Sequence, residues 1–306
     1  MLTPSMAEVA RRAGVSKNTV SLALRGSPRV TAETRERVEA AARELGYRLN
    51  PTVAHRGRAE QLGYTLDEFW LHDPELPIAR WQSIFRTRNI RGAVVVGMMQ
   101  SNRLPPRFRP LWDDIPVLVT GVRTRAPALS YACSDHHSLA LLAFEKAAAL
   151  GYRRPGLVLD GVIDDLIEGR FTAGFLAGQS RFVAADQRTE PFHQVAAART
   201  DRGLFVRWLK KNRPDVIFTL YHEVDEWLRD AGVRVPEDIG LVQYEWRADH
   251  GEWAGMDQRN DLVGEAAVDM LVSMVHHNER GVPEHPRATM IGCHWVEGRT
   301  VRDTRA

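Results

Sequence analysis

Apolar residues recur at helical spacing over the first 46 positions of the chain, which predicts a small bundle of three helices. The first helix is expected over 6–13, where Ser5 and Glu8 form a capping box that satisfies free backbone donors at a helix start. Gly14 then supplies a tight turn. The positions that would share one core are Val9, Ala10, Ala13, Val15, Val20, Leu24, Val38, Ala41, Ala42 and Leu45.

Two further capping signals mark the other helices of this bundle. Ser16 is placed to cap a second helix that ends near Leu24. A third helix is expected from a cap at Thr31 to the glycine stop at Gly46. Two short helices joined by a glycine turn are typical of a helix-turn-helix, so residues 1–49 are predicted to form an all-α headpiece of that kind.

From about residue 62 the pattern changes to strand-like apolar runs that alternate with helical ones, which is typical of a parallel α/β fold. Strands are expected at 64–71, 92–97, 116–120, 156–159, 216–220, 239–244 and 290–295. Helices are expected at 78–89, 137–150, 170–181, 201–212, 224–231 and 261–277, the last either in the core or at a dimer interface. The break at 151–155 predicts two lobes, with an N-lobe over 62–150 and a C-lobe over 151–301.

Composition indicates a folded chain, with 44% hydrophobic and 26% charged residues. No apolar run approaches the roughly 20 residues of a membrane helix. Pro4, Ser5 and Glu8 interrupt the first apolar positions, so no secretion signal is expected and the cytoplasm is the predicted location. Cys133 and Cys293 lie far apart without metal-ligand spacing nearby, which predicts neither a disulfide framework nor a zinc site.

The small net charge of +2 hides a strong division along the chain. Residues 1–58 contain eleven Lys or Arg against five Glu, which is +6, and the remainder is therefore −4. A basic head on an acidic body indicates a polyanionic partner for the head alone.

The predicted second helix would present Lys17, Asn18, Ser21 and Leu22 outward, at the end that enters a DNA major groove. Lysine donates to guanine, asparagine pairs with adenine, and leucine contacts a thymine methyl group. The alternative is a generic three-helix bundle whose polar face is merely solvated. Residues expected to hold phosphates or to complete the DNA contact are Ser5, Ser16, Thr19, Arg25, Tyr47 and Asn50.

The segment VARRAGVSKNTVSLALRGSPRVTAETRERVEAAARELGYRLNP resembles the headpiece of LacI/GalR-type repressors. The resemblance implies an arginine at the position that Leu22 occupies in this chain, so the operator sequence is expected to differ from those of family members. It also implies that residues 50–61 are a hinge, whose helix normally places a leucine in the minor groove. Arg56 stands near that position here, which argues against kinking by an apolar wedge.

The phrases LGYRRPGLVL, RPDVIFTL, AGVRVPEDIGLVQYEW and CHWVEGRTV resemble the periplasmic-binding-protein-like effector domain of the same family, over most of 62–301. The resemblance implies a small effector, for example a carbohydrate, bound between the lobes, and it implies a homodimer. Only about a dozen residues separate Pro51 from Leu62, so the first strand and most of the first helix of that domain are missing. An N-lobe of four rather than five parallel strands is therefore expected, with exposed edges.

Ligands of open α/β sheets bind beyond the carboxyl ends of the strands, and this rule selects His72, Met98, Asp135, Asp160, Tyr221, His222 and Glu245. The resemblance adds weight to Asp135 and Glu245 and adds Gln258. Carboxylates and amides suit sugar hydroxyls, while Trp70, Tyr221 and Trp246 suit an apolar ring face. The plain alternatives are helix caps, solvated charges and core aromatics. The resulting effector set is His72, Asp135, Tyr221, His222, Glu245 and Gln258. Arg170 lies one position before the place where the resemblance implies an effector-binding arginine.

Three functions follow as hypotheses: an effector-controlled DNA-binding regulator, a DNA binder that has lost effector control, and a sugar binder or enzyme with an incidental head. No phosphate loop, nucleophile elbow or metal cluster supports catalysis, so neither catalytic residues nor a cofactor nor a metal site is expected. The pairs His136-His137 and His276-His277 are predicted to be surface histidines, and Asp164-Asp165 a loop.

Overall fold

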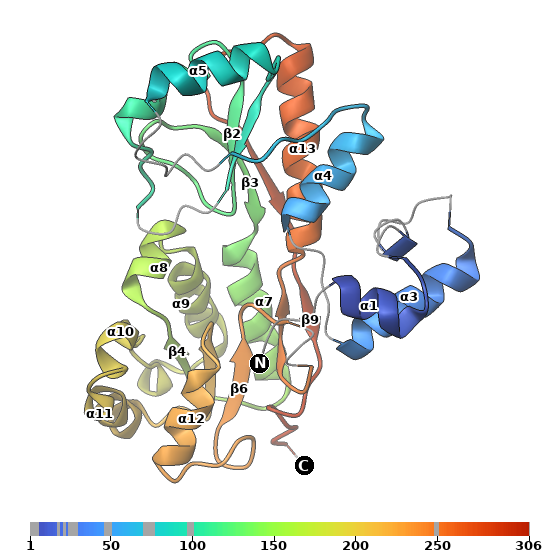
Figure 1. Ribbon diagram of the computed structural model, residues 1–306. Coiled ribbons are helices and arrows are strands. Elements are labelled where there is room, and N and C mark those ends of the chain that lie inside the picture. Colours follow the sequence, from blue (N-terminus) through green and yellow to red (C-terminus); the bar gives the residue numbers. More distant parts are fainter. Residues whose placement is uncertain are drawn as a thin grey trace.

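The computed structural model describes residues 6–16, 19–20, 23, 30–45, 51–69, 77–96, 101–247 and 251–305, and shows a helical module and a two-lobed α/β body (Figure 1). The module contains α1 (Met6–Ala13) and α3 (Ala32–Leu45), with residues 19, 20 and 23 also helical. Gly14 has a φ of 65°, a left-handed conformation that suits glycine and ends α1.

The core of the module confirms the sequence pattern. Val9, Val20 and Val38 are fully buried in one cluster, which also includes Ala23 and Val30. The side chains of Leu24 and Leu45 lie outside the described part. Short alanine and valine side chains allow three short helices to approach closely around one small core.

The upper lobe in Figure 1 contains a parallel sheet in the order β1-β2-β3-β8. Its strands are β1 (Ala93–Val95), β2 (Val117–Thr120), β3 (Ser130–Ser134) and β8 (Ala288–Ile291). The expected four-stranded sheet is therefore confirmed among the described residues. The short edge strand β1 is only half-buried, and Val96 beyond it is exposed, as the loss of an internal strand predicts.

Helices cover both faces of this sheet, which explains why its strands are apolar on both sides. One face packs on α13 (Asn260–His276) through Leu118 and Ala132. The other packs Val117, Val119 and Tyr131 against Trp81 and Trp112. The elements on that side are α5 (Ile78–Thr87), the 3-10 helix η1 (Pro106–Phe108) and α6 (Arg109–Trp112).

The lower lobe contains a second sheet in the order β4-β5-β6-β7-β9, parallel except for the antiparallel pair β7 and β9. Its strands are β4 (Pro155–Val158), β5 (Val216–Thr219), β6 (Gly240–Gln243), β7 (Ala254–Asp257) and β9 (His294–Val296). One cluster joins it to α7 (His136–Ala149) and α9 (Arg170–Phe182), and another to α11 (Arg202–Asn212) and α12 (Glu223–Asp230). Shorter helices are α8 (Gly161–Leu166), η2 (Ala185–Gln187) and α10 (Val195–Ala198).

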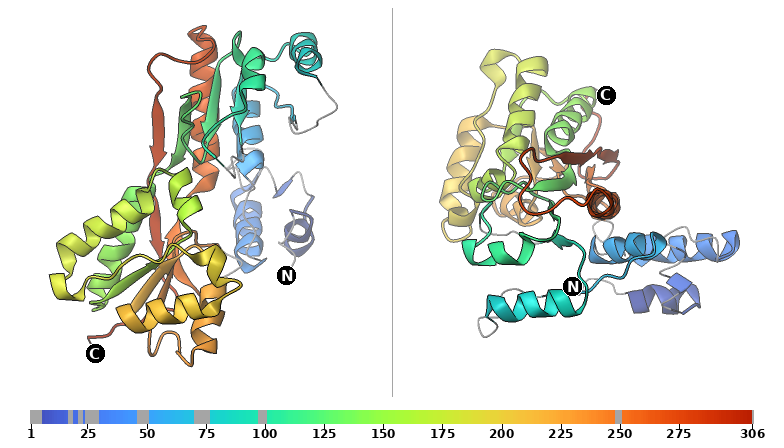
Figure 2. Two further views of the ribbon diagram at one scale, coloured as in Figure 1. Left: turned by 90° about the vertical axis from the view of Figure 1, so that its left-hand side faces the viewer. Right: turned by 90° about the horizontal axis from the view of Figure 1, so that it is seen from above.

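The two lobes are not consecutive in sequence, which differs from the expected division at 150/151. The chain passes between the sheets after β3, after β7 and between β8 and β9, and Figure 2 shows the last of these segments running along the long axis. The helix α7 packs on α9 in the lower lobe, whereas α13 and β8 return to the upper one. Sequence order alone could not reveal these returns.

Several predicted elements differ from those observed. Residues 64–69 form no strand, and 70–71 lie outside the described residues. The strands β3 and β7 were not expected. The predicted strand at 290–295 is instead two strands in two sheets, separated at 292–293 where the chain changes lobe.

Three side-chain expectations are also settled by packing. Asp164 is buried within α8 rather than in a loop, and its carboxylate accepts a hydrogen bond from the backbone N–H of Thr172. His136 is buried at the start of α7, contrary to the surface prediction, whereas His276 and His277 are exposed as predicted. The sequence left open whether the helix at 261–277 packs in the core or at a dimer interface. In the structure Val263, Ala267 and Met274 of α13 pack on the sheet, so this face of the helix lies in the core.

Among the described residues, no helix has both the length and the apolar character needed to cross a membrane.

Candidate DNA-binding headpiece and effector site

The start of the second helix is built as the sequence predicts. The Ser16 hydroxyl oxygen accepts a hydrogen bond from the Thr19 backbone N–H at 3.0 Å, and the Ser16 carbonyl accepts from Val20 N–H at 3.0 Å. Thr31 caps α3 in the same way, accepting from Thr34 N–H at 3.3 Å. These caps fix where each helix begins.

Most of the predicted DNA-contacting residues lie outside the described residues. Ser16 and Thr19 lie within them, at the cap just described. The sequence predictions for the others are not tested by the structure, and the same holds for the effector candidate His72 and for Trp70 and Met98. Those DNA candidates are Ser5, Lys17, Asn18, Ser21, Leu22, Arg25, Tyr47 and Asn50.

The predicted hinge forms a helix, α4 (Pro51–Gln61), that packs against α13 of the upper lobe (Figure 1). Ala54 and Ala59 are buried, and the Arg58 guanidinium donates to Asp269 at 2.6 Å. That hydrogen bond is the chief reason why the pKa of Arg58 is raised. A further hydrogen bond of 2.8 Å joins the Tyr64 hydroxyl to Nε2 of His276. The linker is thus part of the body.

Arg56, which stands where the family resemblance implies an apolar wedge, points to a different partner. Its guanidinium donates to Glu68 at 3.1 Å, and both side chains are 47% exposed. An exposed ion pair of this kind contributes at most about 1 kcal/mol. The side chain at this position is therefore a solvated arginine on the surface of α4.

Replacing Ala59 by Glu should detach α4 from α13. The substitution places a carboxyl group in a buried position, where even a neutral polar group without a partner costs about 1–3 kcal/mol and an ionised carboxylate costs more. Hydrogen exchange of the amides in 54–61 measures the effect, with faster exchange expected in the variant. The matched control is Gln61→Glu, which adds the same charge at an exposed position and retains the acceptor for Arg58. Equal exchange in both variants would contradict the docking of α4.

Two predicted effector residues serve as structural groups in this structure. Asp135 caps α7, where its carboxylate accepts from the Ser138 N–H at 3.1 Å and from the Ser138 hydroxyl at 2.7 Å. Burial raises the pKa of Asp135, but these hydrogen bonds outweigh it and the pKa is lowered. Gln258 is buried, and its side-chain amide donates to the Tyr244 backbone carbonyl at 3.0 Å. The backbone carbonyl of Gln258 accepts from the Ser134 hydroxyl at 2.8 Å.

The other predicted effector residues follow strands of the lower lobe. The Tyr221 hydroxyl accepts from Asp160 N–H at 3.1 Å, and burial raises the pKa of Tyr221 to about 12. His222 contacts Trp253 edge to face at 4.8 Å. Glu245 pairs with Arg247 at 3.0 Å. The rule that ligands bind beyond the carboxyl ends of strands thus selected residues that follow β5 and β6.

A group of contacts between the lobes was missed by sequence reasoning. Arg170 of α9 donates from Nη2 to the Tyr131 hydroxyl of β3 at 2.8 Å, and Nη1 lies 3.6 Å from the Cys133 sulfur. Glu168 pairs with Arg170 and also with Arg123, which follows β2. Only Arg170 was marked as an effector candidate in the sequence, because Glu168 and Arg123 lie in loops and Tyr131 and Cys133 lie in β3, a strand that was not expected.

Burial and charge also act on a histidine at this boundary. His136 lies 5.0 Å from the Phe171 ring, and its Nδ1 has no hydrogen-bond partner among the described residues. Burial lowers the pKa of His136 to about 4, with the positive charge of Arg170 acting in the same direction. The imidazole is therefore neutral at physiological pH.

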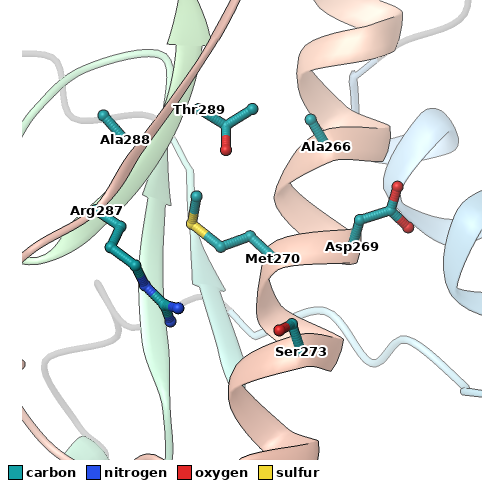
Figure 3. Close-up of a pocket in the computed structure, with 7 residues that line it drawn as sticks. All are labelled: Ala266, Asp269, Met270, Ser273, Arg287, Ala288 and Thr289. Atoms are coloured by element: carbon teal, nitrogen blue, oxygen red, sulfur yellow. The ribbon is translucent and has the colours of Figure 1, made fainter.

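A surface hollow of about 640 Å³ lies within the upper lobe, between α13 and β8 (Figure 3). Its lining residues are Ala266, Asp269, Met270, Ser273, Arg287, Ala288 and Thr289. Asp269 is engaged by Arg58, and Arg287 pairs with Glu279 at 2.6 Å. None of the predicted effector residues lines this hollow, so it is distinct from the lobe boundary.

Comparisons with known proteins agree with this architecture. Residues 5–50 match the family model described as bacterial regulatory proteins, lacI family, and residues 144–301, more than half of the chain, match the periplasmic binding protein-like domain. The chain is 25% identical over 308 residues to the Lactose operon repressor of Escherichia coli (strain K12), covering 87% of this chain and 83% of that protein.

Two solved structures show the same fold. A transcriptional regulator CelR–cellobiose complex has a TM-score of 0.60 at 19% identity, covering 97% of this chain and 99% of that one. The lac repressor dimer bound to operator and the anti-inducer ONPF has a TM-score of 0.58 at 18% identity, covering 98% and 100%. With a matching headpiece, a matching body and the same two-lobed fold, the chain belongs to the LacI/GalR family of DNA-binding transcription regulators.

Proposed function

We propose that the protein is a repressor that binds a palindromic operator as a homodimer in the bacterial cytoplasm, with each headpiece reading one half-site. The observation that carries this proposal is the basic headpiece, in which a compact core and the Ser16 cap present the start of a second helix. Residues 1–49 contain nine Lys or Arg against five Glu, and this charge of +4 suits DNA phosphates. The relative named as a lactose operon repressor, and the neighbour described as a dimer bound to operator, support it.

Base reading is assigned to Lys17, Asn18 and Leu22, with Arg25 on phosphate. Replacing Asn18 by Ala should cost about 1–3 kcal/mol at one operator position, because an asparagine that pairs with adenine loses both hydrogen bonds. Binding selection from a random DNA library first yields the operator, and fluorescence anisotropy then measures every single-base variant. Arg25→Ala is the control, and it should weaken all sequences about equally. The same uniform weakening by Asn18→Ala would instead make Asn18 a phosphate contact.

We infer that the body responds to a small molecule of the carbohydrate class held between the lobes, and that the protein is a regulator rather than an enzyme. The candidate contacts are His72, Asp135, Tyr221, His222, Glu245 and Gln258. The neighbouring structure described as a cellobiose complex supports a ligand-binding role for this fold. Operator titrations with and without candidate ligands test the response.

A second candidate function is DNA binding without effector control, and two observations favour it. The sheet of the upper lobe has four described strands, and Arg170 ties the lobes together through Tyr131. If operator affinity is unchanged by every ligand that raises the thermal stability of the protein, effector control has been lost. A ligand that both stabilises the protein and changes operator affinity would support control.

A further inference from the structure

We propose that the boundary between the lobes binds an anionic ligand, whose carboxylate or phosphate group takes the place of the Glu168 carboxylate among Arg123, Arg125 and Arg170. The inference rests on the proposed function, because the lobe boundary is the proposed effector site, and it names the chemical class of that effector.

One carboxylate is shared by three guanidinium groups at this boundary. Glu168 lies 3.4 Å from Arg123, 3.6 Å from Arg125 and 3.4 Å from Arg170. Charge-assisted hydrogen bonds between guanidinium and carboxylate groups are normally about 2.7–2.9 Å long. The three long contacts show a carboxylate placed between the arginines without a close fit to any of them.

The cluster has a surplus of positive charge. Three guanidiniums face one carboxylate, and the nearby carboxylate of Asp135, on which the charge of Arg170 also acts, already accepts hydrogen bonds from Ser138. Arg170 is largely buried, and it also donates to the Tyr131 hydroxyl. The side chains of Arg123 and Arg125 are 44% and 56% exposed, so it is the charge of Arg170 that is partly desolvated and attracts an anion more strongly than the same charge in water.

The arginines come from the places where this kind of fold binds ligands. Arg123 and Arg125 follow the carboxyl end of β2, and Arg170 begins α9 of the other lobe. Ligands of open α/β sheets bind outside the carboxyl ends of the strands. An anion held here would therefore contact both lobes at once.

Two local features of the backbone and side chains lie at or beside the segment that carries Glu168. Glu168 has a φ of 61°, a left-handed conformation that is uncommon for a residue other than glycine and is found at functional sites. Asn102 is 7% exposed and donates to the Leu166 carbonyl at 2.9 Å, but its side-chain oxygen accepts no hydrogen bond from the described residues. An acidic molecule suits three guanidinium groups better than a neutral sugar does.

The test compares phosphate binding by the full-length protein and its Glu168→Gln variant, measured by calorimetry without DNA. Inorganic phosphate and acetate are titrated at constant ionic strength set with chloride. Removing the internal carboxylate should increase phosphate affinity at least tenfold, and adding Arg123→Gln and Arg125→Gln to that variant should abolish the gain. The acetate arm separates a carboxylate preference from a phosphate preference. D-glucuronate should bind more tightly than D-glucose, which lacks the carboxylate.

The matched control is Glu223→Gln, which removes a carboxylate that pairs one to one with Arg199 at 2.7 Å and should leave phosphate affinity unchanged. If Glu168→Gln does not fold, Arg125→Gln in the otherwise native chain should lower phosphate affinity instead. Phosphate affinity that is equal in all variants, or tighter binding of glucose than of glucuronate, would overturn the proposal. Operator binding is measured separately, so its failure is distinguishable from failure of anion binding.

Discussion

Replacing Phe218 by Ala should lower the free energy of unfolding of the lower lobe by about 3–5 kcal/mol. Phe218 is fully buried in the centre of β5. Its ring lies 5.8 Å from Phe144, 6.1 Å from Phe175 and 5.6 Å from Tyr244. Truncation to Ala would remove the shared partner of these rings and leave a cavity that helices α7 and α9 cannot close without moving off the sheet.

Chemical denaturation monitored by tryptophan fluorescence measures this loss. The matched control is Phe182→Ala, which removes the same side chain from the C-terminal end of α9, where Phe182 is 42% exposed and stacks on Phe144 at 6.1 Å. Its expected loss is about 1 kcal/mol, because little apolar area leaves water there. Equal losses at the two positions would show that the ring cluster is not the centre of the lobe core.

The same core shows which parts of the fold could be predicted from the sequence. The strands β2 and β5 contain consecutive apolar residues, mostly β-branched or aromatic, which is the pattern of a strand covered on both faces. The strands β3 and β7 have the sequences SYACS and AGMD, in which serine, glycine and aspartate break that pattern. Their burial comes from neighbouring strands, so it was not visible in either segment alone.

Contacts between residues far apart in the sequence limit how much of the candidate sites could be predicted. The Ser16 cap was predictable because its donor is three residues away. The contact of Arg170 with Tyr131 spans 39 residues and two lobes. The docking of α4 on α13 joins Arg58 to Asp269, 211 residues later, so the sequence indicated a hinge there although the structure has a packed helix. Family resemblance supplied the fold, but these departures depend on residues particular to this chain.

The free energy of unfolding should fall by about 2 kcal/mol between pH 7.5 and pH 5 through His136 alone. Burial lowers the pKa of His136 to about 4 in the folded chain, against 6.5 for an exposed histidine. The unfolded state therefore takes up a proton first as the pH falls. The stabilising effect of the neutral imidazole is complete above pH 6.5 and is lost as the pH falls toward 4, at up to about 1.4 kcal/mol per pH unit.

The variant His136→Gln isolates this contribution, since glutamine does not titrate. The native protein should lose about 2 kcal/mol more than the variant over the same pH interval, as measured by urea denaturation at each pH. His285→Gln is the control, because His285 is 91% exposed and its removal should leave the pH dependence unchanged. If His136→Gln kept the full pH dependence, His136 would have to be accessible to protons in the folded state. Because His136 begins α7 and its buried ring packs against Phe171 of α9, that result would require these two helices to separate readily in solution.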